Sequence, residues 1–501
     1  MLNKAFIVTP LYKSRQVKDA EMQKVKTGDC SLFNLVELAA SAAFELLQQL
    51  EKTSDPVYLL AGNGNNGSDA YVLASLLLKA GVTANVMSKH KAVLHGELQQ
   101  AQKIYMDQGG TIQPFCESTI LSASVIVDGL LGTGLRQEKL TEEMDKLISV
   151  INESKAWVLS LDVPSGIDAD TGFAYSTAVK ANATLTFGGT KQGLYTGRSR
   201  HFSGKIYHVF VGLEKQLPKT NTWVITQCNV SHVLPVRAKD VHKGDNGKLA
   251  VIGGDSSMMG AVMMASEAGL RAGAGLVSVI SRPEHLLAVN VKRPEVMFCA
   301  CDTLEEKVRS RIDWAETIVI GPGLGQGAWG ETLLNAVKMS LESSHQACVI
   351  DADALHLLKQ QPWRHGQWVL TPHTGEAARL LNISRREVEQ NRFSAIKQLH
   401  QIYGGVVVLK GAGTLIYDGE DMIIAPVGNP GLASGGSGDV LSGLIGGLLA
   451  QGLNMMNAAI LGVVIHGKAA DLAAIEGEIG MLASDLMPFI RQLLNEEIVK
   501  I

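Results

Sequence analysis

The chain has 501 residues, of which 46% are hydrophobic and 19% charged, and this length and composition favour two soluble globular domains over one. A net charge of −4 gives no support to binding of bulk nucleic acid or of an anionic membrane surface. Apart from Cys299 and Cys301 the six cysteines are widely spaced, and they form no zinc motif; the N-terminal apolar run is too short for a signal peptide. We therefore expect a cytoplasmic protein.

Short apolar runs alternate with helical patterns along nearly the whole chain. This rhythm predicts parallel sheets covered by helices, the α/β class, joined by right-handed crossovers. In the first half the expected strands are 57–61, 125–128, 157–162 and 183–187, with a helix over 69–80. After residue 240 the expected strands are 248–254, 317–321, 348–351, 368–371 and 405–410.

Three further features complete the expected organisation. A polar, proline-containing segment near 213–240 interrupts the rhythm and predicts a linker, so we place the domains at 1–222 and 223–501. The stretch 414–425 predicts a hairpin that turns at Asp418-Gly419, and Ser384 with Glu387 predicts a capping box that opens a helix running to about Tyr403.

One stretch, 441–465, is long and apolar enough to suggest a membrane span. Polar residues at 451, 454 and 457 and many glycines interrupt it. Two buried helices joined by a turn are therefore expected there, and no membrane association.

Three loops of the first domain follow predicted strands and combine glycines with polar side chains: 59–69, 127–135 and 161–168. Loops at the carboxyl ends of parallel strands meet at one edge of a sheet, where ligands bind. Asn66, Asp128 and Ser165 then offer oxygens for a hard cation, and Asp162 is a candidate acid or base. The alternative is that each loop is only a tight turn between strand and helix.

The second domain carries its strongest signal in N-P-G-L-A-S-G-G-S-G-D, residues 429–439. Its glycines would present backbone N–H groups to an anion, and a helix is expected to begin near Asp439. The aspartate is either a helix cap or a general base that takes a proton from a hydroxyl while a phosphoryl group is transferred.

Four more loops of this domain follow predicted strands. Their sequences are G-P-G-L-G (321–325), D-A-D-A-L (351–355), T-P-H-T-G-E (371–376) and K-G-A-G-T (410–414). The last is suited to the phosphate or ribose of a nucleotide. Five such loops at one sheet edge are hard to explain as turns alone.

Together with H-K-G-D-N-G (242–247), these loops resemble the bifunctional NAD(P)H-hydrate repair enzymes, over about residues 10–215 and 235–495. That family joins an NAD(P)HX epimerase to an NAD(P)HX dehydratase. The resemblance implies an N-terminal Rossmann-like and a C-terminal ribokinase-like three-layer sandwich. It also implies epimerisation of R- and S-NAD(P)HX, in which water has added at C6 of the ring, and dehydration of the S form with ADP, giving AMP and phosphate.

The resemblance also implies functional residues, position by position. The epimerase site should contain Asn65, Asn66, Gly67, Ser68, Asp69, Gly132, Thr133, Gly134, Leu135, Arg136, Gln137, Glu138 and Asp162. Potassium should bind at Asn66, Asp128 and Ser165. The hydrate in the dehydratase should contact Ala261, Gly323, His373 and Asp439. The nucleotide should contact Lys410, Gly411, Ala412, Gly413, Thr414 and Gly438, with Mg²⁺ expected in this domain.

The chain departs from the family pattern at Ser68, where the family usually has glycine. A serine disfavours positive φ and would add a side chain near the expected phosphate, which bears on the efficiency of the epimerase. The partners expected are small molecules, NADHX or NADPHX and ADP, and further copies of this chain in a homo-oligomer. The rival interpretation is a ribokinase-like small-molecule kinase with a non-catalytic N-terminal binding domain.

Overall fold

The structure is a computed structural model that describes residues 4–28, 30–89, 95–134 and 140–501. The chain forms two compact units, one of residues 10–222 and one of residues 1–9 together with 223–501. The prediction had assigned residues 1–222 to the first domain. The first nine residues instead belong to the C-terminal unit, because β1 (Phe6–Pro10) lies beside β9 (Thr222–Asn229) in its sheet. β9 lies in the segment 213–240 that was predicted as a linker. The polar residues on both sides of this strand concealed its apolar pattern in the sequence.

The N-terminal unit is built on a seven-stranded sheet whose paired strands are all parallel, in the order β4-β3-β2-β5-β6-β7-β8. The strands are β2 (Val57–Ala61), β3 (Ala84–Ser88), β4 (Ile112–Gln113), β5 (Val125–Gly129), β6 (Trp157–Leu161), β7 (Ala183–Phe187) and β8 (Lys205–Val209). The four predicted strands are its central members. Their order reverses between β2 and β5, which is where open α/β sheets bind ligands.

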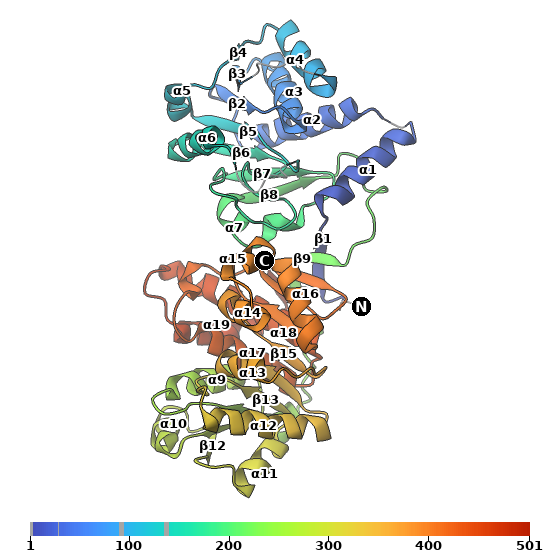
Figure 1. The fold of residues 1–501 in the computed structure, drawn as a ribbon. Helices are drawn as coiled ribbons and strands as arrows, with labels where there is room; N and C mark the ends of the chain where they lie inside the picture. The colour runs from blue at the N-terminus through green and yellow to red at the C-terminus, as the bar shows by residue number, and fades with distance from the viewer. Residues whose placement is uncertain (1–3, 29, 90–94, 135–139) are drawn as a thin grey trace. The chain divides into compact units, whose positions relative to one another are not determined.

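Helices cover both faces of this sheet and make three layers (Figure 1). One apolar cluster joins the sheet to α2 (Leu32–Gln49), α3 (Asn65–Lys79) and α4 (Gly96–Asp107). A second cluster joins the opposite face to α5 (Glu117–Ser122) and α6 (Glu142–Glu153). Helix α1 (Ser14–Lys26) precedes them, and α7 (Ser199–Phe202) lies between β7 and β8. The expected Rossmann-like sandwich is confirmed.

The C-terminal unit contains a twelve-stranded sheet in the order β1-β9-β18-β17-β16-β15-β14-β13-β10-β11-β12, with β19 paired to β9. The neighbours from β16 to β12 are parallel, whereas β16, β17 and β18 are antiparallel, as the predicted hairpin required. The bounds are β10 (Lys248–Ile252), β11 (Leu276–Ser281), β12 (Met297–Ala300), β13 (Thr317–Ile320), β14 (Ala347–Ile350), β15 (Trp368–Leu370), β16 (Val406–Leu409), β17 (Thr414–Tyr417), β18 (Met422–Ala425) and β19 (Ile498–Lys500).

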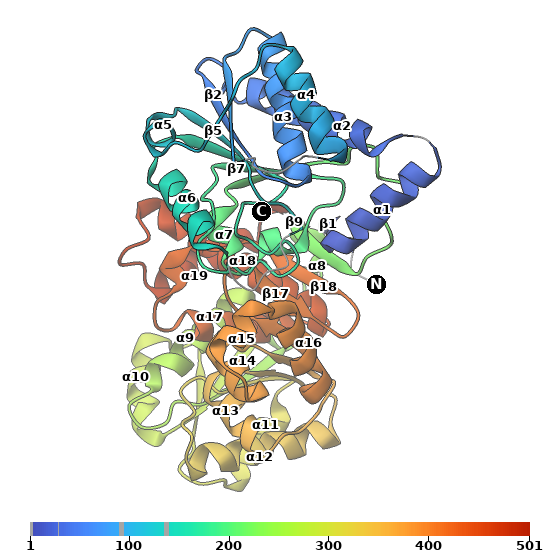
Figure 2. The same ribbon diagram turned by 45° about the horizontal axis from the view of Figure 1, so that its top comes forward.

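Two groups of helices sandwich this sheet. One face carries α9 (Met259–Ala272), α17 (Ser437–Ala450), α18 (Met455–Ala473) and α19 (Leu486–Leu493). The other carries α11 (Glu306–Trp314), α12 (Ala328–Ser343), α13 (Ala352–Gln360), α14 (Thr374–Leu381), α15 (Arg385–Gln390) and α16 (Arg392–Tyr403), most of which face the viewer in Figure 2. Two short helices, α8 (Val230–Val233) and α10 (Leu286–Lys292), complete the unit.

Small residues let α17 pack closely against α9. A Cβ added at Gly443 would lie 2.0 Å from the carbonyl oxygen of Ala265, and one at Gly447 would lie 2.6 Å from that of Gly269. The glycines of this apolar stretch are therefore required by helix packing.

The two helices expected in the apolar stretch 441–465 are present as α17 and α18, with a turn at 451–454 between them. By length and composition, the segment Met455–Glu476 could cross a membrane, but 67% of its most apolar window is buried inside the protein. A core helix of a globular domain has the same properties, so this segment is weak evidence for a membrane span.

The predicted capping box at Ser384 is confirmed: its hydroxyl accepts from the N–H of Glu387 at 3.1 Å, and the Glu387 carboxylate accepts from the N–H of Ser384 at 2.7 Å. The prediction of one helix to Tyr403 is wrong. Asn391 interrupts it, because its side chain caps α16 by accepting from the N–H of Ser394 at 2.9 Å.

Candidate active sites

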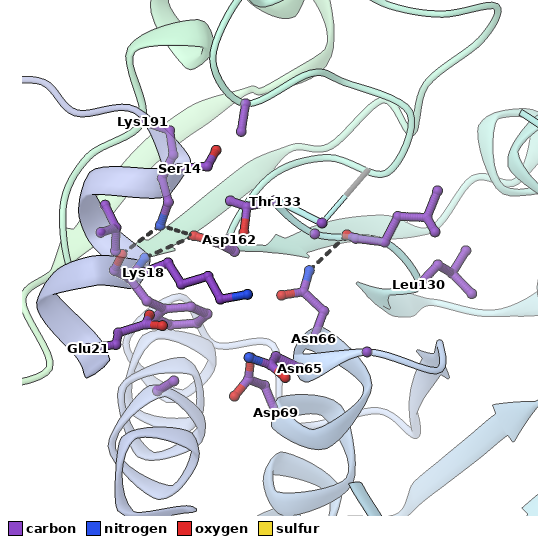
Figure 3. Close-up of a pocket in the computed structure, with 18 of the residues that line it drawn as sticks. Ser14, Lys18, Glu21, Asn65, Asn66, Asp69, Leu130, Thr133, Asp162 and Lys191 are labelled. Carbon is purple, nitrogen blue, oxygen red and sulfur yellow. Dashed lines mark hydrogen bonds and ion pairs between the residues drawn. The ribbon is translucent and has the colours of Figure 1, made fainter. Parts of the chain in front are cut away.

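A cavity of about 1170 Å³ lies in the N-terminal unit, where the strand order reverses (Figure 3). Helix α1, the start of α3, and the loops that follow β5 and β6 surround it. The predicted residues that line it are Asn65, Asn66, Asp69, Gly132, Thr133, Gly134 and Asp162. The three loops expected to converge therefore do so. Leu135, Arg136, Gln137 and Glu138 lie outside the described residues.

Gly67 and Ser68 do not line the cavity. A Cβ added at Gly67 would lie 2.1 Å from the carbonyl oxygen of Gly62, so the glycine serves close packing of the turn. Ser68 lies within helix α3, has a negative φ and is only 1% exposed. The expected conflict with positive φ and with a bound phosphate is absent, because this position is helical and faces the interior. Its hydroxyl has no hydrogen-bond partner among the described residues.

The three residues expected to bind a cation meet around the backbone of Leu131. The Asn66 amide donates to the carbonyl oxygens of Leu131 and Leu161, each at 2.8 Å. The Ser165 hydroxyl donates to Asp128 Oδ1 at 2.6 Å and accepts from the N–H of Leu131 at 2.9 Å. Two carbonyls, a hydroxyl, an amide and a carboxylate thus lie together, an oxygen-rich set suited to a hard cation.

Asp128 is completely buried, and burial raises its pKa, although hydrogen bonds from Ser165 and Ser160 oppose the rise. Within the described part of the chain the carboxylate has hydrogen-bond donors but no ion-pair partner. A buried anion without a counter-charge is costly. A monovalent cation at this position would neutralise it, so the residues present fit K⁺.

Asp162 follows β6 and lies in the cavity wall with φ of 62°, a left-handed conformation that is unusual for a residue other than glycine. Its Oδ1 accepts from the Lys191 ammonium, from the Thr186 hydroxyl at 3.1 Å and from the N–H of Phe187 at 3.3 Å. Lys191 itself is only 2% exposed. A buried ion pair therefore forms part of the cavity wall.

Two further carboxylates lie close to this pair, and one of them was not predicted. Burial, with the charges of Asp162 and Glu21, raises the pKa of Asp69 well above its ordinary value. Burial likewise raises the pKa of Glu21, which reaches the cavity from α1.

Sequence reasoning missed Glu21 and Lys191. Lys191 follows the predicted strand 183–187, so the rule applied to the other loops could have found it.

In the C-terminal unit the loops after β13, β14, β15 and β16 all follow the carboxyl ends of adjacent parallel strands. In the first, Gly323 has φ of 57° and lies so near α9 that an added Cβ would be 3.3 Å from the Cβ of Ala261. The Asp353 carboxylate accepts from the N–H of Gly325 at 3.0 Å and holds this loop. Ala261 and Gly323, predicted to contact one ligand, are therefore neighbours.

Lys410 connects three of the loops. Its ammonium donates to Asp351 at 2.9 Å and lies 3.9 Å from Glu376, and a Cβ added at Gly438 would be 3.3 Å from its Nζ. Burial lowers the pKa of Lys410, but the charges of Asp351 and Glu376 outweigh it and leave the pKa raised. Lys410 thus places a fixed positive charge beside the start of α17.

The loop 410–414, predicted to contact a nucleotide, rests on a buried arginine. Arg392 donates to the carbonyl oxygens of Leu409 at 3.1 Å and Lys410 at 3.3 Å, and a Cβ added at Gly411 would lie 2.9 Å from its guanidinium. Thr414 closes the loop by donating to the carbonyl oxygen of Gly411 at 3.0 Å. Arg392 was not predicted, since a single arginine within a helix carries no signal.

Asp439 lies in the first turn of α17, after Gly436, whose φ of 91° starts the helix. Burial raises its pKa from 3.8 to about 7; the charge of Asp351 adds to the rise and that of Lys410 opposes it. In the described part of the chain its carboxylate accepts no hydrogen bond from a helix N–H. A carboxylate with a pKa near 7 is better suited to act as a general base than as a helix cap.

His373 caps helix α14. Its Nδ1 accepts from the N–H groups of Gly375 at 2.9 Å and Glu376 at 3.3 Å, while its side chain is half exposed. Burial and then the charge of Lys410 lower its pKa to about 4, so the ring is neutral at pH 7. Its Nε2 can therefore offer a neutral hydrogen bond to a ligand.

Comparisons with known proteins identify the family to which the chain belongs. Residues 249–492 match the family model described as NAD(P)H-hydrate dehydratase, and residues 33–193 match that of the YjeF-related protein N-terminus. The chain is 44% identical to a bifunctional NAD(P)H-hydrate repair enzyme of Coxiella burnetii, covering 97% of this chain and 100% of the relative. It is 39% identical to the Escherichia coli enzyme of the same description, covering 99% and 96%.

Among solved structures, a ribokinase-like superfamily protein from Enterococcus faecalis is similar, with 27% identity and a TM-score of 0.52, over 56% of this chain and 98% of that one. The ribokinase-like fold of the C-terminal unit is thereby confirmed. The two matched domains and the full-length relatives favour cofactor repair over a small-molecule kinase. The chain belongs to the bifunctional NAD(P)H-hydrate repair enzymes, with an epimerase domain followed by a dehydratase domain.

Proposed function

We propose that the cavity beside Asp162 is where the R and S hydrates interconvert, and that Asp439 is the base of the dehydratase. The single observation that supports this most strongly is the placement of these two partly buried carboxylates. Each lies near the carboxyl ends of parallel strands in its own unit, among residues of the family motifs.

The epimerase needs a base and an acid, because C6 of the hydrate bears both a hydroxyl and the ring nitrogen. Asp162 takes the hydroxyl proton as the C6–N1 bond breaks; its electron pair passes to N1, which takes a proton, and C6 becomes an aldehyde. Rotation about C5–C6 and reclosure by the reverse steps give the other epimer. Asp69, whose pKa is raised well above its ordinary value by burial, is the acid in the same cavity.

K⁺ would be held by Asn66, Asp128 and Ser165 together with the backbone oxygen of Leu131. When bound, this ion supplies positive charge close to the loop that carries Gly132 and Thr133, which line the cavity. Asp128 and Ser165 fix that loop by their hydrogen bonds to the backbone of residues 130 and 131. The N–H groups at the start of α3 face anionic groups of the substrate.

The dehydratase converts the C6 hydroxyl, which is a poor leaving group, into a phosphate ester, from which phosphate leaves easily. Asp439 takes the proton of the C6 hydroxyl, the hydroxyl oxygen bonds to the β-phosphorus of ADP, and AMP leaves. The C6–O bond then breaks with release of phosphate, and loss of a proton from C5 restores the ring double bond. Lys410 and the N–H groups of 435–438 stabilise charge on the transferred phosphoryl group.

ADP would lie along the loop 410–414, with Gly438 beside its phosphates and Ala261, Gly323 and His373 around the hydrate. Mg²⁺ is expected with the nucleotide. In the described ranges no group of three or more His, Cys, Asp or Glu side chains could hold a metal. Such an ion would therefore be held largely by the phosphates, whose charge it neutralises.

The test uses the purified chain with mixed NADHX epimers and ADP, followed by the absorbance of the reduced nicotinamide. Conversion of the whole mixture with release of free phosphate supports both activities. Conversion of only the S half contradicts the epimerase proposal. A stable phosphorylated product in place of NADH contradicts the dehydratase mechanism.

A further inference from the structure

The Lys191 side chain has an unusual place in the epimerase domain. It is almost completely buried, yet it lines the cavity. Its ammonium donates to Asp162 Oδ1 and, at 2.6 Å, to the carbonyl oxygen of Phe187 (Figure 3). Burying an ammonium is costly, so a pair at this position requires a reason beyond stability.

The pattern of hydrogen bonds on Asp162 suggests what that reason is. The described residues donate hydrogen bonds to only one oxygen of its carboxylate, Oδ1. The donors are Lys191, Thr186 and the N–H of Phe187. The other oxygen, Oδ2, is left for a ligand. The carboxylate is thus held in one orientation by donors behind it.

The electrostatic surroundings of Asp162 point the same way. The charged and titratable groups that face the pair come from three elements: Lys18 and Glu21 on α1, Asp69 on α3, and His208 on β8. Two of these four are carboxylates, which disfavour a further negative charge. Among these groups of the described residues, Lys18 would be the cation left beside the carboxylates without the Lys191 ammonium, and its side chain is exposed.

We propose that Lys191 is a positioning residue of the epimerase: its ammonium holds Asp162 Oδ1, offsets the charge of the neighbouring carboxylates and directs Oδ2 toward the substrate hydroxyl. This inference rests on the proposed role of Asp162 as the base. Lys191 acts through Asp162 and not on the substrate, since its ammonium is turned to Asp162 and to a backbone carbonyl.

The experiment compares Lys191→Met with the wild-type full-length chain in the mixed-epimer assay. The S epimer is consumed at the dehydratase rate, and the R epimer then follows at the epimerisation rate. The expected result is a fall of about 10²–10⁴-fold in the epimerase kcat, as for loss of a general base, with KM within about twofold. The acidic limb of the epimerase pH profile should move up by about 1–3 pH units, and the dehydratase rate should not change.

Three further variants separate the loss of the Lys191 charge from other effects of the substitution. Lys180→Met, which removes an exposed lysine of the same unit, should leave both rates unchanged. Lys191→Arg, which keeps the charge, should return the acidic limb toward the wild-type position. In the double variant Asp162→Asn with Lys191→Met no buried charge is left unpaired, and its epimerase rate should equal that of Asp162→Asn alone.

Four results would contradict the proposed role of Lys191. A rise in KM with kcat unchanged would make Lys191 a substrate contact and overturn the inference, as would a lower rate with an unshifted pH profile. A double variant slower than Asp162→Asn would show that Lys191 acts independently. Normal epimerisation by Asp162→Asn would instead overturn the proposed base, and the role of Lys191 with it.

Discussion

Replacement of Asp439 by asparagine tests the dehydratase mechanism most directly. The change removes the base but keeps the size of the side chain, so the contacts of α17 with α9 remain. Loss of a positioned general base costs about 10²–10⁴-fold in rate. Asp439→Asn should therefore lose dehydratase activity by that factor, while ADP binding and epimerisation stay within about twofold.

The pH dependence of the wild-type dehydratase follows from the same residue. With a pKa of about 7, Asp439 is about half ionised at pH 7, and about one tenth ionised at pH 6. The base acts in its ionised form, so the rate should rise with pH and level off above pH 8. A profile that is flat between pH 6 and pH 8 would refute the assignment.

Stability provides an independent check on the environment of Asp439. A carboxyl whose pKa is raised binds its proton more tightly in the folded protein than in the unfolded chain. The free energy of unfolding should therefore fall as the pH rises from about 3.8 through about 7, and stay reduced above that. At pH 8 the Asp439→Asn variant should accordingly melt at a higher Tm than the wild type. Asp439→Asn with normal dehydratase turnover, or with a lower Tm at pH 8, would contradict this reasoning.

Three other predictions concern the rest of the molecule. Asp128→Ala should weaken the stimulation of epimerisation by K⁺ at least about tenfold, measured by titration with potassium against sodium; an unchanged response would argue against the cation site. Ser68→Ala removes a buried hydroxyl that has no hydrogen-bond partner among the described residues, and should raise the free energy of unfolding by about 1 kcal/mol with no effect on epimerase kcat/KM. Gly443→Ala should destabilise the C-terminal unit by about 1–3 kcal/mol in chemical denaturation, because its Cβ would meet the Ala265 carbonyl at 2.0 Å, whereas the control Gly260→Ala meets no atom within 4 Å.

Much of the fold could be predicted because the strands of both sheets are short apolar runs followed by glycine-rich loops. The position of Asp439 at a helix start, and of the 59–69, 127–135 and 161–168 loops at the ends of strands, follows from that local pattern alone. Sheet topology then brings the loops together, since parallel neighbours share one edge.

What could not be predicted depends on contacts between distant segments. The ion pair of Lys191 with Asp162 joins residues 29 positions apart, and Glu21 reaches the cavity from a helix more than a hundred positions before Asp162. β1 pairs with a strand more than two hundred residues later, which no local pattern reveals. The prediction places Ser68 in the loop 59–69, before a helix over 69–80, whereas the helix begins at Asn65 and buries this serine.

The membership of β1 in the C-terminal sheet means that the epimerase domain is an insertion. The polypeptide leaves the dehydratase unit at residue 9 and returns at residue 223, so the epimerase is tethered at both ends. During synthesis the epimerase is complete first, while β1 has to wait for β9 to emerge before it can pair. A dehydratase expressed from residue 223 alone would leave one edge of β9 uncovered, and such an edge invites aggregation. β1, although it is made before the whole epimerase domain, can therefore pair only after that domain has been synthesised.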